Sequence, residues 1–118
     1  MARYEDRDDS SVVLGVAAGL IGSPCAGVDA ASRGVIDAAG FGEWFVHRTG
    51  HGIGMEAHED PYMVAGNDTP IAVGHAYSVE PGIYIPGKWG MRLEDIVVAT
   101  TSGPQPVNHA NHHLVVES

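Results

Sequence analysis

The sequence predicts an α+β fold in which two helices pack on one face of a curved antiparallel sheet. The first observation is that residues 5–21 and 28–39 carry apolar side chains at helical spacing. The second is that glycine and proline divide the rest of the chain into short apolar segments, as turns divide strands. The third is that two such segments flank the sequence PGKWG at 86–90, which has the length and composition of a hairpin turn. Helices followed by a run of strands are typical of this fold class.

The helices are predicted over residues 5–21 and 28–39. The apolar positions of the first helix are Val12, Val13, Val16, Ala17 and Leu20. Two glycines inside it lower its helical propensity, and Pro24 then breaks the chain. Asp29 lies near the start of the second helix, where a carboxylate suits the unpaired N–H groups. Gly40 stands where a helix stop is expected.

The strands are predicted after the second helix. A short strand is expected at 44–46, and residues 61–74, which contain Gly, Asn, Asp and Pro, are expected to form a loop. Two longer strands are expected at 75–85 and 91–100, joined by the turn at 86–90. The remaining expected features are a turn and short terminal strands, at 103–104, 107 and 114–116.

Composition restricts the class of protein. The 118 residues suit a single small domain, 1–118, and 44% hydrophobic with 18% charged residues indicates a globular chain. Fifteen acidic against six basic residues give a formal charge of −9, which disfavours nucleic acid and anionic membranes as partners. Cys25 is the one cysteine, so it has no partner for an intrachain disulfide and is expected to be a buried thiol. With neither a signal peptide nor a membrane span in the pattern, we expect a cytoplasmic setting.

Two glutamates and one histidine are candidates for chemistry. Glu80 and Glu94 lie on the two arms of the predicted hairpin, where side chains on one face come opposite or diagonal to each other. Two facing carboxylates repel unless a cation or a proton lies between them. His51 adds an imidazole nitrogen, and this ligand set suits Zn²⁺, Mn²⁺, Co²⁺ or Fe²⁺. Such an ion with open positions can lower the pKa of water into the neutral range, which is the chemistry of hydrolysis. On spacing alone, the two glutamates also fit solvated charges on exposed strand faces.

The glycine context strengthens this candidate site. Alternate residues from 50 to 54 are glycine and His51 lies among them, which predicts close approach of another backbone segment. The dipeptide Pro-Gly follows Glu80, which is unusual in the middle of a sheet and indicates a bulge. Both features are more typical of backbone at a functional site than of a regularly paired strand.

Three motifs carry a family resemblance. They are HRTGHGIGMEAHE at 47–59, SVEPGIY at 78–84 and RLED at 92–95. In this order they resemble the metallopeptidases of pita-bread fold, most closely the Xaa-Pro dipeptidase (prolidase) and aminopeptidase P branch. The resemblance covers nearly the whole chain, including the helix predicted at 28–39. Methionine aminopeptidases share the GHGIG core but fit less well, because their last glutamate is not in an RxED run so soon after Glu-Pro-Gly.

The resemblance implies a partial pita-bread (creatinase/aminopeptidase-like) fold and matches the chain to the C-terminal half of the catalytic domain. It implies that His51, Glu80 and Glu94 are three of the family's five metal ligands, with Glu94 bridging two metals. The implied cofactor is a divalent metal, with Mn favoured and Co, Zn or Fe as alternatives.

The resemblance also implies catalytic parts for five side chains. His58 matches the histidine that hydrogen-bonds the scissile carbonyl and the developing oxyanion. His47 matches a histidine of the substrate pocket, and Arg92 and Tyr84 match polar residues that support the site. Glu80 matches a residue that handles the proton of the attacking water.

Structural interpretations stay open for several of these side chains. Arg92 also fits a structural ion pair with Glu94 or Asp95, and Tyr84 also fits a half-buried aromatic of a strand. His75 stands where the family has an apolar residue, so it is either a buried neutral histidine or an added polar group. The C-terminal histidines fit a solvent-exposed cluster without a metal, at 109, 112 and 113.

The implied activity is metal-dependent hydrolysis of dipeptides or Xaa-Pro bonds, with a small peptide as substrate. The family's other two ligands are aspartates on strands upstream of the first helix, and Asp6, Asp8 and Asp9 lack that strand pattern. We therefore expect weak or absent peptidase activity from this chain alone, with the missing half or a second copy as a partner. The alternatives are a non-catalytic binding module, or a truncated product or piece of a split enzyme of the same fold.

Overall fold

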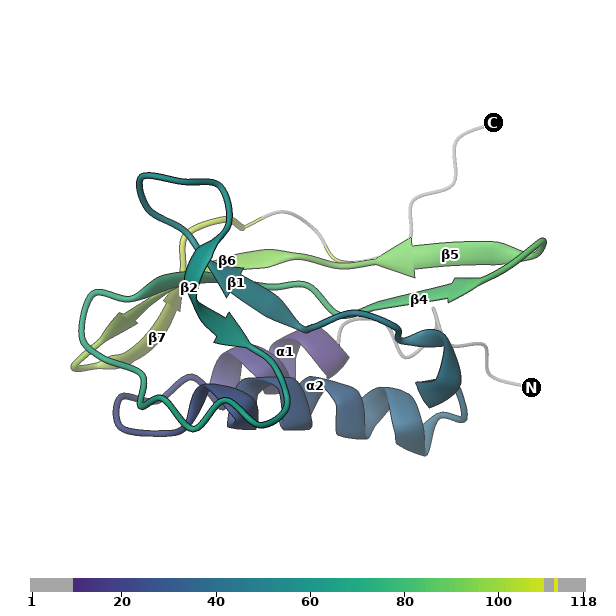
Figure 1. Cartoon of the computed structure of the whole chain (residues 1–118), viewed down its shortest axis with the longest axis horizontal. Helices are drawn as coiled ribbons and strands as arrows, with labels where there is room; N and C mark the ends of the chain where they lie inside the picture. The colour runs from purple at the N-terminus through teal and green to yellow at the C-terminus, as the bar shows by residue number, and fades with distance from the viewer. Residues whose placement is uncertain (1–9, 110–111, 113–118) are drawn as a thin grey trace.

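Two helices lie along one face of an antiparallel sheet in the computed structural model, which describes residues 10–109 and 112 (Figure 1). The helices are α1 Ser10–Ala17 and α2 Cys25–Ala38, followed by a 3-10 turn, η2 Gly42–Trp44. The strands are β1 Gly50–Gly52, β2 Glu59–Met63, β3 Ala76–Val79, β4 Gly82–Ile85, β5 Trp89–Arg92, β6 Asp95–Thr100 and β7 Gly103–Pro106. The main sheet has the order β2-β1-β3-β6-β7, and β4 pairs with β5 as a separate ribbon. The predicted α+β class is confirmed.

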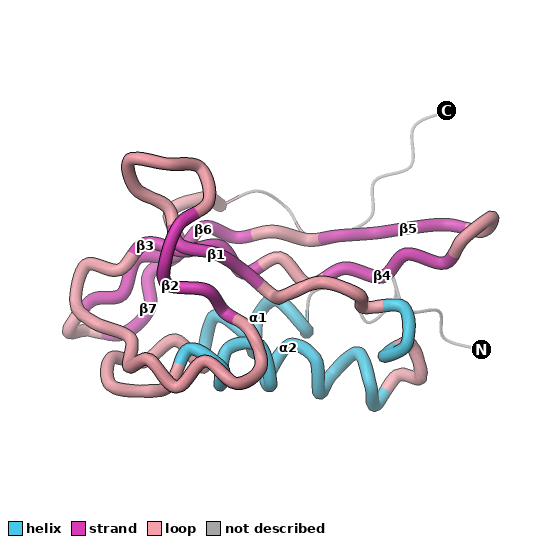
Figure 2. The backbone as a smooth tube through the Cα atoms, viewed as in Figure 1, coloured by secondary structure: helices cyan, strands magenta, loops and turns pink. Residues whose placement is uncertain are grey.

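The predicted hairpin is present, but it is interrupted. β3 pairs with β6 and β4 pairs with β5, both antiparallel, so that each predicted long strand appears as two short ones (Figure 2). The pairs that flank the interruption are Val79–Asp95 and Gly82–Arg92. The register is the same on both sides, and Glu80 therefore falls opposite Glu94. The loop is shorter than predicted, because Ile85 already pairs with Trp89.

The core lies between the helices and the sheets, in two clusters. The first lies beneath the main sheet and consists of Val12, Cys25, Val28, Met63, Ile71, Tyr77, Val79, Val97 and Ala99. The second lies beneath the β4–β5 ribbon and consists of Ile36, Phe45 and Ile83. Gly15 lets α1 approach α2 and the sheet closely, since a Cβ there would lie 2.2 Å from Ser32 Oγ and 2.8 Å from Val79 Cγ1. This glycine lowers helical propensity and is nevertheless required by packing.

Both predicted helix ranges need correction. The first helix ends at Ala17, not at residue 21, and the predicted residues 5–9 lie outside the described residues. The second begins at Cys25, three residues earlier than predicted, after Pro24 in extended backbone. Asp29 is consequently inside the helix and buried, so the prediction that it serves the helix start is wrong. Gly40 has φ 90° just after the helix, as expected of a glycine stop.

Three predictions for strands and loops are also wrong. Residues 44–46 form no strand, because the chain there turns through η2 and then stays irregular. The predicted loop at 61–74 begins with strand, since β2 continues to Met63. Val107 is outside any strand, although its N–H donates to Ile96 O. The edge strand that pairs with the outer side of β6 is β7, whose first two residues the sequence prediction treated as a turn. Residues 114–116 lie outside the described residues.

Within the part of the chain that the structure describes, no helix has both the length and the apolar character that a membrane crossing requires.

Candidate metal centre

His51 lies in β1 between two glycines that its neighbours require. A Cβ at Gly50 would lie 1.7 Å from Ser78 O, and one at Gly52 would lie 2.2 Å from Asp60 O. The strands on both sides of β1 therefore approach its backbone more closely than any side chain allows. The close approach predicted from the glycine pattern is confirmed, and it leaves His51 only 9% exposed.

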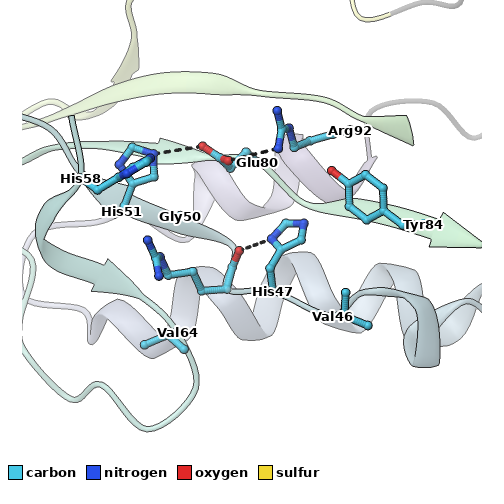
Figure 3. Close-up of a pocket in the computed structure, with 10 residues that line it drawn as sticks. Val46, His47, Gly50, His51, His58, Val64, Glu80, Tyr84 and Arg92 are labelled. Carbon is cyan, nitrogen blue, oxygen red and sulfur yellow. Dashed lines mark hydrogen bonds and ion pairs between the residues drawn. The ribbon is translucent and has the colours of Figure 1, made fainter. Parts of the chain in front are cut away.

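Hydrogen bonds orient the His51 ring. Its Nδ1 lies 3.0 Å from Gly52 O, and since a carbonyl oxygen only accepts, Nδ1 carries the proton. Nε2 points to the Glu80 carboxylate, 3.3 Å away (Figure 3). The backbone N–H of His51 donates to Ser78 Oγ at 3.1 Å, which ties this residue to β3. This is the arrangement that metal-binding histidines use, with one nitrogen fixed and the other presented.

Glu80 and Glu94 meet at the interruption of the hairpin, where they lie opposite each other. Burial by itself raises the pKa of the Glu80 carboxyl, yet hydrogen bonds, above all that from Ser78, hold this pKa below its ordinary value. The pKa of Glu94 is raised, first by burial and then by its hydrogen bond to Glu80 and by the charge of Glu80. The pair thus favours one shared proton, as the sequence led us to expect for facing carboxylates without a cation.

These three side chains fit a divalent cation. One ligand atom from each of His51, Glu80 and Glu94 lies within 4.8 Å of the others. Ligands about 2.1 Å from a shared ion lie at most about 4 Å apart, so a small side-chain adjustment completes the geometry. One imidazole nitrogen and two carboxylates form a set that Mn²⁺, Zn²⁺, Co²⁺ and Fe²⁺ accept. The three residues, distant in sequence, therefore form the cluster that the sequence predicted. Their role as metal ligands stays a prediction.

The other predicted site residues line a cavity of about 790 Å³ beside this cluster. Its lining residues are Val46, His47, Arg48, Gly50, His51, His58, Val64, Glu80, Tyr84 and Arg92 (Figure 3). The His58 ring stands edge-on to that of His51, with the centroids 4.2 Å apart. Arg92 Nη1 lies 3.8 Å from Glu80 Oε1, so Arg92 forms an ion pair with Glu80, and its charge also acts on Glu94. Tyr84 is 36% exposed on β4, as the structural interpretation of a strand aromatic expected.

His47 presents an unsatisfied nitrogen in this cavity. Its Nδ1 lies 2.6 Å from Arg48 O and must donate to that carbonyl. Its Nε2 is buried and has no hydrogen-bond partner among the described residues. The ring also packs against Phe45 and Tyr84, with centroids 5.1 and 5.6 Å away. A buried polar atom without a partner costs free energy, so a group in the cavity that bonds to Nε2 would be favoured.

Sequence reasoning missed two polar residues and misplaced one histidine, His112. Ser78 bonds both to His51 and to Glu80, and only its place in the second motif could have indicated it. His112 was expected to be exposed, but its Nε2 lies 2.8 Å from Asp95 Oδ1. His75 is half-buried and its Nδ1 accepts from the Ala72 N–H at 3.1 Å, whereas His113 lies outside the described residues.

The predicted buried thiol at Cys25 is confirmed, and burial raises its pKa. The second missed residue is Thr49, which lies two residues before His51 and whose carbonyl accepts the Glu80 N–H.

Comparison with known proteins identifies the class and then the family. The fold is that of the pita-bread metallopeptidases: a crystal structure of dipeptidase PepE from Mycobacterium ulcerans superposes with a TM-score of 0.90 at 51% identity. The model of metallopeptidase family M24 matches residues 14–101, and the chain belongs to this family. The resemblance inferred from the three motifs is thereby confirmed.

Two curated relatives carry dipeptidase names. Over 89 residues the chain is 58% identical to a probable dipeptidase PepE of Mycobacterium tuberculosis and 49% identical to an Xaa-Pro dipeptidase of Lactobacillus delbrueckii subsp. lactis. Each alignment covers 75% of this chain and 24% of the relative. The superposition on the Mycobacterium ulcerans enzyme covers 93% of this chain and 30% of that one. The chain therefore spans about a quarter of the length of the curated relatives that it matches.

Proposed function

We propose that this chain is the C-terminal, metal-binding half of the catalytic domain of a dipeptidase that acts on small peptides, including Xaa-Pro dipeptides. The observation that carries the proposal is the convergence of His51, Glu80 and Glu94 within 4.8 Å on a fold of metallopeptidase family M24. The dipeptidase names of the relatives support the substrate class. A pure binding module has no need of this ligand set, and we therefore favour the enzymatic lineage.

We propose the following parts for the residues in the cavity. A divalent ion, with Mn²⁺ favoured, would polarise the scissile carbonyl and lower the pKa of water. Glu80 takes up a proton from the attacking water, since its lowered pKa keeps it a carboxylate at neutral pH. His58 donates a hydrogen bond to the oxyanion from the exposed side of His51. His47, with its unsatisfied Nε2, and Tyr84 and Arg92 hold the peptide.

Metal affinity tests the ligand set directly. We expect the purified chain to bind one Mn²⁺ per molecule and Glu94→Ala to weaken that binding at least tenfold, because one of three ligands is lost. Isothermal titration calorimetry and metal analysis measure both quantities. Glu43→Ala is the matched control, since Glu43 is an exposed glutamate in η2, away from the three ligands. Equal affinity of the wild type and Glu94→Ala would remove Glu94 from the site.

We propose that the 118-residue chain alone has little peptidase activity. Its three candidate ligands approach the ion from one sheet surface, and Glu94 is exposed, so the other side of the ion faces solvent. The physical consequence is weak binding of one ion and poor exclusion of water from the carbonyl. Release of proline from an Xaa-Pro dipeptide with added Mn²⁺ is the assay. Turnover near 10 s⁻¹, about the median for enzymes, would contradict the proposal.

We further propose that a second polypeptide surface completes the site, either the other half of the catalytic domain or another copy of this chain. A reducing, cytoplasmic setting suits the buried free thiol of Cys25. The charge of −9 disfavours a nucleic-acid or anionic membrane partner.

A further inference from the structure

A partly buried ion pair on α2 holds the segment that leads into β1. This segment, residues 45–49, is named the strap because it joins η2 to β1. Arg33 makes two hydrogen bonds of 3.0 Å to the Asp29 carboxylate one turn earlier. The same guanidinium donates to Phe45 O and to His47 O, both at 2.9 Å, and lies 4.0 Å from the centre of the Phe45 ring. One side chain therefore fixes two carbonyls of the strap.

Thr49 extends this network to both ligand segments. Its Oγ1 donates to Asp29 Oδ1 at 2.8 Å, and its N–H also lies 3.2 Å from that oxygen. Its carbonyl accepts the N–H of Glu80 at 2.7 Å, while His51 follows two residues later in the chain. Thr49 is completely buried and Asp29 is 1% exposed, so neither group can replace these bonds with bulk water.

The position of the strap affects the site because His47 lies within the strap and His51 follows it. His47 and His51 flank the anchored Thr49, and Gly50 leaves no free space between β1 and β3. A buried polar network whose members are all hydrogen-bonded makes the segments that it joins rigid. Loss of the Thr49 hydroxyl would remove one donor to Asp29, and loss of Arg33 would leave the Asp29 charge unpaired; either change would allow the strap to move.

We infer that Asp29, Arg33 and Thr49 are positioning residues for the metal cluster: they fix the strap and through it the places of His51 and Glu80. The expected effect on metal affinity rests on the proposed function. The positioning of the strap itself follows from the hydrogen bonds alone. None of the three side chains lines the cavity, so they act through the ligands and not on the substrate.

Two substitutions at Thr49 form a matched test. Thr49→Val keeps the shape and removes the hydroxyl, whereas Thr49→Ser keeps the hydroxyl and removes a methyl group. We expect Thr49→Val to weaken Mn²⁺ binding by about tenfold, in the range found for residues that support metal ligands, and Thr49→Ser to restore most of the affinity. Val12→Ala, in the core beneath the main sheet, destabilises the fold without contacting the strap and is the control. All titrations are run at a temperature where each variant is fully folded.

A second measurement needs no metal. Amide hydrogen exchange at His51 and Glu80 is expected to quicken at least fivefold in Thr49→Val and in Arg33→Gln, but not in Thr49→Ser. If the wild type binds no Mn²⁺ while this exchange pattern holds, the proposed function fails and the positioning role stands. If Thr49→Val matches the wild type in both affinity and exchange, or if Val12→Ala reproduces its effects, the positioning role is wrong.

Discussion

At the residue scale, burial of the Tyr77 hydroxyl costs folding free energy, because its neighbours among the described residues offer it no hydrogen bond. Its side chain is completely buried in β3, and its hydroxyl has no hydrogen-bond partner among the described residues. Burial raises the pKa of Tyr77 to about 12, and the nearby Cys25 thiol adds to the rise. A folded-state pKa above the unfolded value means that the stability due to the neutral phenol is fully present below pH 10.0 and is lost as pH rises through about 12.

Tyr77→Phe is expected to stabilise the chain by about 1 kcal/mol at pH 7, because it removes a buried polar group that has no partner. Between about pH 10 and 12 the wild type should lose stability that the variant keeps, so the difference should grow. Urea unfolding followed by circular dichroism measures both effects. Tyr84→Phe, at an exposed tyrosine, is the control and should change neither. A variant that is clearly less stable than the wild type would reveal a partner for the hydroxyl.

At the element scale, β1 is the most constrained strand because the neighbouring backbones approach its glycines closely. A Cβ at Gly50 would meet Ser78 O, which belongs to the backbone and cannot rotate away. Gly50→Ala must therefore push β1 and β3 apart, and the separation displaces His51 from Glu80. The distance between β1 and β3 therefore determines the geometry of the metal cluster.

Gly50→Ala is expected to cost about 3 kcal/mol, at the upper end of the effect of overpacking, and to weaken Mn²⁺ binding. Gly34→Ala is the matched control, because a Cβ there meets nothing within 4 Å. In the interior of α2 that change should stabilise the fold by about 0.5–1 kcal/mol. Thermal unfolding and calorimetric titration of both variants measure the contrast. A Gly50→Ala chain as stable as the wild type would mean that β1 and β3 are not in such close contact.

The elements that the sequence predicted well are those fixed by local chemistry. The glycines around His51 indicated close approach of a neighbouring backbone, and it is present. The Pro-Gly after Glu80 indicated a bulge; the pairing is instead interrupted there with an unchanged register, so that prediction is wrong in kind. The convergence of His51 and Glu80 with Glu94 was predicted from the hairpin and from the family motifs.

The missed elements depend on contacts between distant segments. Residues 44–46 have strand propensity, but Arg33 takes the Phe45 carbonyl and the segment turns through η2 instead. Asp29 resembles a helix-start residue by position, and only the strap, 20 residues further on, shows its actual partners. His112 bonds to Asp95 across 17 residues, which no local pattern predicts.

At the scale of the whole molecule, the main sheet gives way to the β4–β5 ribbon (Figure 2), and the candidate ligands Glu80 and Glu94 belong to this transition. One core cluster supports the main sheet and the other supports the ribbon. The two strand connections between them are the ones that carry Glu80 and Glu94. A cation bound there would join both halves of the hairpin to β1, so metal binding and stability of the fold should be linked.

The position of a bound ion tests the metal centre most directly. Crystals of this chain grown with Mn²⁺ and measured for anomalous scattering would locate it. We predict one manganese peak with His51 Nε2 and carboxylate oxygens of Glu80 and Glu94 about 2.2 Å away. A peak elsewhere on the chain, or none at these side chains while the protein is saturated with Mn²⁺, would contradict the assignment.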